Sequence, residues 1–118
     1  MPGILGITFE EFVGKLQDSN TKIGKGTMIY ASGKPCCIAG HALKAMVLDH
    51  KDQLPQLNKG TRITFKGLCS GYMEPPTILE LAFAITLDQS IQIVAINDET
   101  PSEDRLKELR AYARQEYI

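Results

Sequence analysis

The stretch that decides the fold is residues 36–48, CCIAGHALKAMVL. Drawn as a helix, it is apolar around almost its whole circumference, and only His41 and Lys44 interrupt the pattern. A helix that is apolar on all sides usually lies at the centre of its fold. Gly40 costs about 1 kcal/mol relative to alanine inside a helix. We therefore expect a neighbouring element to approach this helix closely at Gly40.

Other segments also carry helix signals. After Thr8, apolar residues recur at i, i+3, i+4 and i+7, which is one face of a helix. The T-x-x-E spacing of Thr8 and Glu11 is that of a capping box and predicts a helix over about 9–19. Similar capping signals predict further helices over about 77–85, 86–96 and 101–115.

Three segments carry strand signals. Residues 27–31 and 62–66 could pair as a small ribbon, and residues 90–96 are rich in β-branched side chains, so a strand is the alternative to a helix there. We find no repeat and no linker, which predicts a single globular domain over residues 1–118. The expected fold is mainly α: a compact bundle of four to five short helices around a central apolar helix, to which a small two-stranded β ribbon could be added.

Composition and charge exclude some function classes. The 118 residues include 13 Lys plus Arg and 14 Asp plus Glu, and this balance argues against a nucleic-acid partner. No segment approaches the roughly 20 apolar residues of a membrane helix, and the N-terminus lacks the pattern of a signal peptide. Three cysteines, two of them adjacent, are typical of reduced thiols. We expect a cytoplasmic protein that does not bind a membrane.

Cys36, Cys37 and His41 are the candidate catalytic residues. Both thiols lie at the predicted start of the central helix, where partial positive charge favours a thiolate. His41 follows Cys37 by four residues on the same helix, and the chain has only two histidines. A base that faces the thiols from another element is therefore missing, and we favour the interpretation that both cysteines are small apolar core residues.

Cys37 and His41 also have the i, i+4 spacing of two metal ligands on one helical face. His50 or Cys69 could complete such a site. Structural zinc sites usually contain a C-x-x-C or H-x-x-x-H pair, and the sequence has neither. We therefore predict no metal and no cofactor.

His41, Asn97 and Asp98 are the candidate binding residues. A buried imidazole needs a polar partner, and Asp98 is a candidate partner for His41. Asn97 and Asp98 could orient His41 or bind a ligand. The alternative is that Asn97 ends a helix and that the Asp98 side chain bonds the local backbone in a turn.

Three motifs together carry a resemblance: GKPCCIAGHAL at 33–43, LAFAITLDQS at 81–90 and IND at 96–98. The chain resembles small uncharacterised proteins of bacteria, phages and mobile elements. Those proteins share a Cys-Cys helix with a following glycine, a later leucine-rich helix and an Asn-Asp turn before a final helix. They are described as domains of unknown function, so the resemblance implies no activity. It does imply that the Asn-Asp turn packs near Gly40 or the start of the central helix.

Three functions are consistent with these observations. The first, which we favour, is a small protein-binding or regulatory module without enzymatic activity, because no catalytic set is complete. It would bind a protein partner or a second copy of itself, for example as a phage or mobile-element accessory that inhibits or modulates a host system. The second is a thiol-dependent enzyme or redox sensor that uses Cys36 or Cys37. The third is a small-ligand-binding protein, with a pocket beneath residues 49–61.

Overall fold

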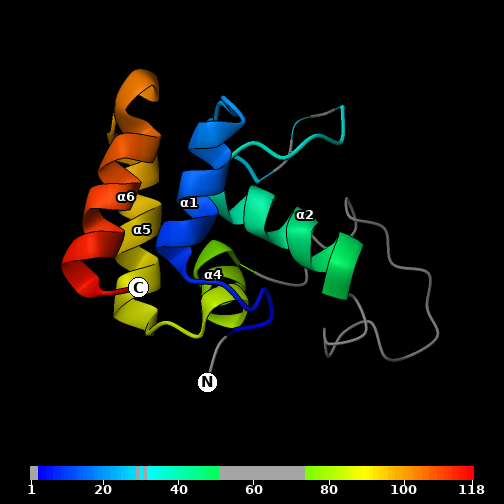
Figure 1. Cartoon of the computed structure of the whole chain (residues 1–118). Coiled ribbons are helices and arrows are strands. Elements are labelled where there is room, and N and C mark those ends of the chain that lie inside the picture. Colours follow the sequence, from blue (N-terminus) through cyan, green and yellow to red (C-terminus); the bar gives the residue numbers. More distant parts are fainter. Residues whose placement is uncertain (1–2, 29, 31, 51–73) are drawn as a thin grey trace.

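The structure is a computed structural model, and it describes residues 3–28, 30, 32–50 and 74–118. The regular elements within these ranges are helices. In chain order they are α1 (Phe9–Asp18), α2 (Ile38–His50), α4 (Pro75–Phe83), α5 (Leu87–Glu99), the short 3-10 helix η3 (Ser102–Asp104) and α6 (Arg105–Glu116). Figure 1 shows these elements in sequence colours. The mainly helical, compact fold expected from the sequence is confirmed.

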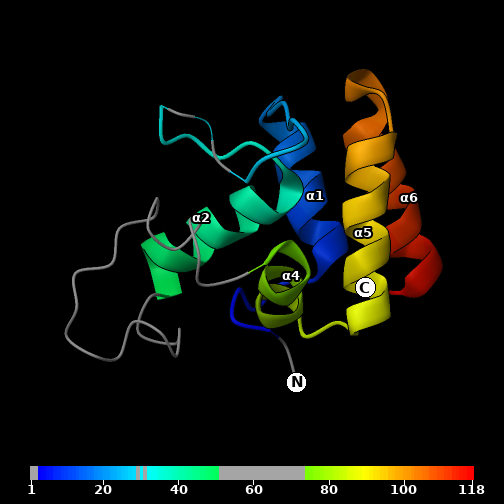
Figure 2. The ribbon, with the colours of Figure 1, turned by 180° about the vertical axis from the view of Figure 1, so that it is seen from behind.

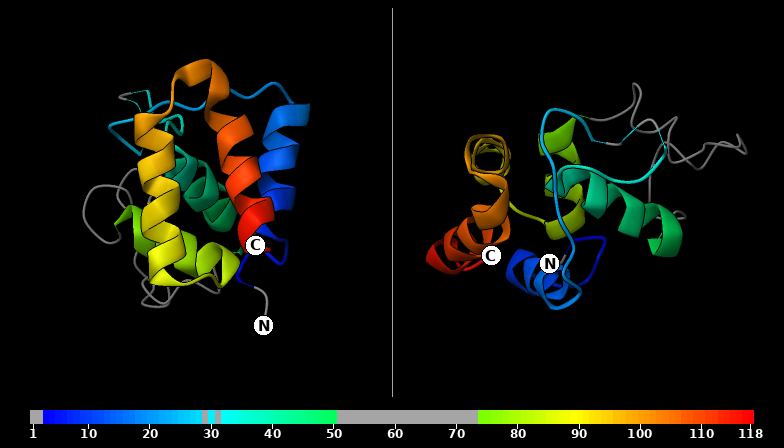
Figure 3. Two further views of the ribbon diagram at one scale, coloured as in Figure 1. Left: turned by 90° about the vertical axis from the view of Figure 1, so that its left-hand side faces the viewer. Right: turned by 90° about the horizontal axis from the view of Figure 1, so that it is seen from above.

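The arrangement of the described helices follows from four helix–helix contacts. Helices α5 and α6 form an antiparallel pair, and α1 lies against α6 (Figures 1 and 2). Helix α4 packs against both α5 and α2, so it joins the two sides of the molecule (Figure 3). The Phe9 N–H donates to the carbonyl of Ile118, which places the C-terminus at the start of α1.

The core lies between the described helices. Phe83, near the end of α4, stacks against Phe9 at 5.2 Å and Phe12 at 5.3 Å between ring centroids. The other large apolar side chains that are fully buried come from each of the α-helices that the structure describes: Val13, Ile38, Leu43, Met46, Ile78, Leu79, Ile93 and Leu109. The interior is therefore one apolar cluster to which every long helix contributes.

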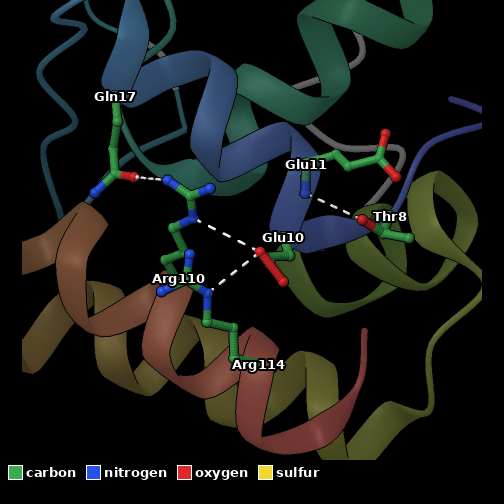
Figure 4. A network of polar contacts seen from close by, with 6 residues as sticks. All are labelled: Thr8, Glu10, Glu11, Gln17, Arg110 and Arg114. Atoms are coloured by element: carbon green, nitrogen blue, oxygen red, sulfur yellow. Dashed lines mark hydrogen bonds and ion pairs between the residues drawn. The ribbon is translucent and has the colours of Figure 1, made fainter.

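Polar contacts fix α1 against α6 on the surface (Figure 4). A carboxylate oxygen of Glu10 lies 3.3 Å from Nε of Arg114 and 3.8 Å from Nε of Arg110. Arg110 also donates to the side-chain oxygen of Gln17 at 2.8 Å. Thr8 accepts a hydrogen bond from the Glu11 N–H at 3.0 Å, which confirms the predicted cap of α1.

Among the described residues, α2 packs mainly against α4 and to a smaller extent against α5. It lies at one side of the bundle, where it buries Leu43 and Met46, while Leu48 is 69% exposed (Figure 1). The close approach at Gly40 is confirmed, because a Cβ there would overlap the carbonyl oxygen of Met28.

Helix α5 resolves the ambiguity of residues 90–96 in favour of a helix. The capping box is complete: Thr86 accepts from the Gln89 N–H at 3.1 Å, and the Gln89 side chain accepts from the Thr86 N–H at 3.0 Å. These bonds satisfy N–H groups that a helix start leaves free. The cap and the burial of Ile93 outweigh the strand preference of the β-branched residues.

Two other helix starts differ from the prediction. Helix α4 begins at Pro75 rather than at Thr77, because proline is favoured in the first helical turn, and Thr77 lies inside the helix. The last helix was expected from residue 101, but residues Ser102–Asp104 form η3 and α6 follows from Arg105 without a side-chain cap.

The predicted β ribbon is not supported. No strand occurs in the part of the chain that the structure describes, and residues 62–66 lie outside that part. Near the first predicted segment, the Cys36 N–H donates to the carbonyl of Met28 and the Tyr30 N–H donates to that of Lys34, both at 2.8 Å. Among the described helices, none has the length and apolar character needed to span a bilayer.

Candidate functional site: an asparagine junction beside an apolar cavity

Asn97 joins α5 to the start of α2. Its side chain is 1% exposed, and its Oδ1 accepts a hydrogen bond from the Ile38 N–H at 3.0 Å. Its Nδ2 donates to the carbonyl of Gly24 at 2.9 Å. The Asn-Asp motif therefore packs at the start of α2, where the resemblance placed it.

The first turn of α2 explains why an amide is needed there. A helix start leaves backbone N–H groups without partners. Cys37 occupies the capping position, since its carbonyl accepts from the His41 N–H at 3.1 Å, and its thiol accepts from the N–H groups of Ala39 and Gly40. The remaining N–H, that of Ile38, is satisfied by Asn97 from another helix.

Arg105 holds the same junction from the other side. Its guanidinium, 6% exposed, donates to the carbonyl of Asn97 at 2.7 Å and to that of Ile23 at 2.9 Å. A cation near the last turn of α5 also interacts favourably with the helix dipole. Sequence reasoning missed Arg105, because no local signal marks an arginine that will be buried against carbonyls from two distant segments.

The side chains of the adjacent residues Cys36 and Cys37 are buried. Burial raises the pKa of the Cys37 thiol above its ordinary value of 9.0, and the N–H groups of Gly40 and Ala39 oppose that rise only in part. The start of a helix does not make this thiol a thiolate at neutral pH. The burial agrees with the interpretation of both residues as packing groups.

His41 does not pair with Asp98, contrary to the prediction. Its Nε2 is buried and has no hydrogen-bond partner within the described ranges, whereas Asp98 accepts from Nδ2 of Asn97 at 3.2 Å. Burial, followed by the charge of Lys44, lowers the pKa of His41 below 6.5. The imidazole is therefore neutral at pH 7.

A cavity of about 160 Å³ lies beside the junction. We call it the α2–α5 cavity. Its lining comes from residues 26–28, the start of α2, Pro75 and one side of α5: Gly26, Thr27, Met28, Cys37, Ile38, Ala39, Pro75, Val94, Asn97 and Asp98. Three predicted candidates, Cys37, Asn97 and Asp98, are thus brought together, whereas Cys36 and His41 are not part of the lining.

An apolar strip on α5 leads to this cavity. Leu87 is 51% exposed and Ile91 is 48% exposed, and Val94 lies in the cavity wall. With Asp98, these residues are spaced at i, i+4, i+7 and i+11, so they share one side of the helix. We call these four residues the α5 face. The sequence indicated that α5 was apolar, but not that two of its apolar residues face outward.

The described residues contain no group of three or more His, Cys, Asp or Glu side chains placed to hold a metal ion. Cys69 and the side chain of His50, the other predicted ligands, lie outside the described part of the chain. No protein-family model, curated protein or solved structure matches this chain.

Proposed function

We propose that the chain is a small protein-binding module whose partner binds the α5 face and the α2–α5 cavity. The observation that carries this proposal is the continuity of the two features. Single exposed apolar residues are common on protein surfaces, but here Leu87 and Ile91 follow one another along a helix and end at an apolar cavity. Such an arrangement can bury apolar side chains of a partner.

We further propose a regulatory role, in which the bound protein belongs to a host system. The site favours binding over catalysis. Among the described residues, Cys37 places its thiol in the cavity wall; the pKa of this thiol is raised, and the buried Nε2 of His41 is not hydrogen-bonded to it. A thiol-dependent enzyme would need a base close to that sulfur.

Site-specific photo-crosslinking in the native host cell tests the proposal. A photoreactive residue at Gln92, which is exposed beside Ile91, should yield adducts with the same protein in repeated experiments. Adding Leu87→Ser and Ile91→Ser should abolish those adducts, and exposed changes of this kind alter stability by only about 0.5 kcal/mol. The matched control places the photoreactive residue at Ala111, an exposed position on α6. The proposal fails if both positions give the same adducts and the serine variants change nothing.

The cavity also favours a second candidate, the binding of a small apolar ligand. A volume of about 160 Å³ can hold one aromatic ring. Native mass spectrometry of the purified protein would then show a mass above that of the chain, and Val94→Trp, which fills the cavity, should remove it. If the wild-type mass equals that of the chain alone, no ligand has been retained and this second candidate loses its support.

A further inference from the structure

The charge carried by α4, α5 and the residues between them is one-sided. Between residues 74 and 99 the sequence has no Lys, Arg or His and has five carboxylates: Glu74, Glu80, Asp88, Asp98 and Glu99. Asp98 lies on the α5 face at the cavity, and helical geometry places Asp88 and Glu99 along one flank. All three are exposed. An incoming surface therefore meets apolar groups beside negative charge.

We propose that the α5 face binds a basic amphipathic helix of another protein, with one apolar side chain in the α2–α5 cavity and Lys or Arg residues against Asp98 and Asp88. This inference rests on the proposed function and specifies its partner. The cavity volume of about 160 Å³ fits a single branched or aromatic side chain. The adjoining carboxylates select positive charge through electrostatic complementarity.

The secondary structure of the partner follows from the groups that α5 exposes. Backbone groups within a helix are bonded to one another, so α5 has no free strand edge to which an extended peptide could add. Contact must come from side chains, and from Leu87 to Asp98 the α5 face spans about 16 Å at 1.5 Å per residue. A helix with apolar residues at i, i+3 or i+4 and i+7 presents a matching strip about three turns long.

A second copy of the chain is a poorer occupant. A two-fold symmetric contact uses the same patch on both subunits. It would bring Asp88, Asp98 and Glu99 of one copy close to those of the other, with no basic residue of α5 to separate them. Nucleic acid is disfavoured for the same reason, because phosphates would face carboxylates.

Three synthetic helical peptides of about 16 residues test the inference by fluorescence anisotropy against the full chain. The first has apolar residues at i, i+4 and i+7 with flanking lysines. The second replaces the lysines with glutamates, and the third keeps the composition of the first but distributes the apolar residues around the helix. We expect the first peptide to bind at least about tenfold more tightly than the second or the third peptide. Its affinity should fall as the salt concentration rises.

Variants of the protein locate the contact. Asp98→Asn and Asp88→Asn should each weaken binding of the basic peptide about two- to fivefold, which is the range of exposed ion pairs. Ile91→Ser should weaken it about tenfold through lost apolar contact. Glu103→Gln and Glu108→Gln, which neutralise exposed carboxylates of η3 and α6, are the matched controls and should change nothing.

Several results would overturn the inference. One is that the acidic or scrambled peptide binds as tightly as the basic peptide, and another is that the basic peptide does not bind at millimolar concentration. A third is that the control variants weaken binding as much as the Asp88 and Asp98 variants do. A fourth is that crosslinks at Gln92 join two copies of the chain. If Gln92 captures another protein but peptide charge has no effect, the proposed function stands and only the basic partner is wrong. If Gln92 captures nothing and no peptide binds, both are wrong.

Discussion

Replacing Asn97 with alanine should destabilise the fold by removing the two side-chain bonds that join α5 to the start of α2. Those bonds are 3.0 Å to the Ile38 N–H and 2.9 Å to the Gly24 carbonyl. Each buried group left without a partner costs about 1–3 kcal/mol, which gives about 2–6 kcal/mol for the pair. Gly24 is only half-buried, so water can take over at its carbonyl. We therefore expect a loss of about 2–4 kcal/mol in the free energy of unfolding.

Urea unfolding followed by far-UV circular dichroism measures this loss. The matched control is Gln92→Ala, an exposed change on the same helix, which should alter stability by no more than about 0.5 kcal/mol. Asn97→Asp separates the two bonds. It keeps an acceptor for the Ile38 N–H but places a carboxylate oxygen against the Gly24 carbonyl, so it should also destabilise the protein at neutral pH.

Amide hydrogen exchange shows whether the effect comes from this junction. Between wild type and Asn97→Ala, the exchange rate of the Ile38 amide should increase more than that of the Leu109 amide, which belongs to a buried residue of α6. The reasoning is refuted if Asn97→Ala matches Gln92→Ala in stability. It is also refuted if the Ile38 amide keeps its wild-type protection, because Asn97 would then not hold the first turn of α2.

Other predictions concern the neighbourhood of α2. Gly40→Ala should lower the free energy of unfolding by about 1–3 kcal/mol, because its Cβ would overlap the Met28 carbonyl; a loss below about 0.5 kcal/mol in urea would contradict that contact. His41 has a lowered pKa, so unfolding favours its protonation, and wild type should lose stability relative to His41→Gln as pH falls below 6.5. Superimposable pH profiles of the two proteins would rule this out. The raised pKa of Cys37 should keep its alkylation slow at neutral pH until urea unfolds the chain, as peptide mass spectrometry can follow. Reaction of the folded protein at the rate of a free thiol would show that explanation to be wrong.

Sequence reasoning succeeded where the decisive contacts are local. The capping residues Thr8, Thr86 and Gln89 bond within three positions along the chain, so spacing alone predicts them. It failed at α4, where the signals of Pro75 and Thr77 overlap and the proline sets the helix start. The position of a helix in the bundle depends on distant segments, so the apolar pattern of α2 alone does not identify its neighbours.

The candidate site was only partly predictable for the same reason. The Asn-Asp motif could be placed at α2 through the resemblance, but Arg105 reaches Ile23 across 82 positions of sequence, and no spacing indicates that contact. The composition of α5 does not show which of its apolar residues form the α5 face. Ile91 and Ile93 are two residues apart and equally apolar, yet the packing of α4 and α6 buries Ile93 and leaves Ile91 exposed.

The asparagine junction and the proposed binding surface share the same residues. Ile38 and Asn97 are bonded to each other and also line the α2–α5 cavity, and Asn97 lies between Val94 and Asp98 of the α5 face. The bond that satisfies the start of α2 therefore also links the two walls of the cavity. Under the proposed function, the site is then formed before a partner arrives. Apparent affinity falls with the fraction of molecules in the competent conformation. Asn97→Ala should thus weaken binding of a basic helix, and the loss of affinity should be larger than the loss caused by the unfolded fraction of the variant alone. Equal affinity per folded molecule would show that the cavity forms without this bond.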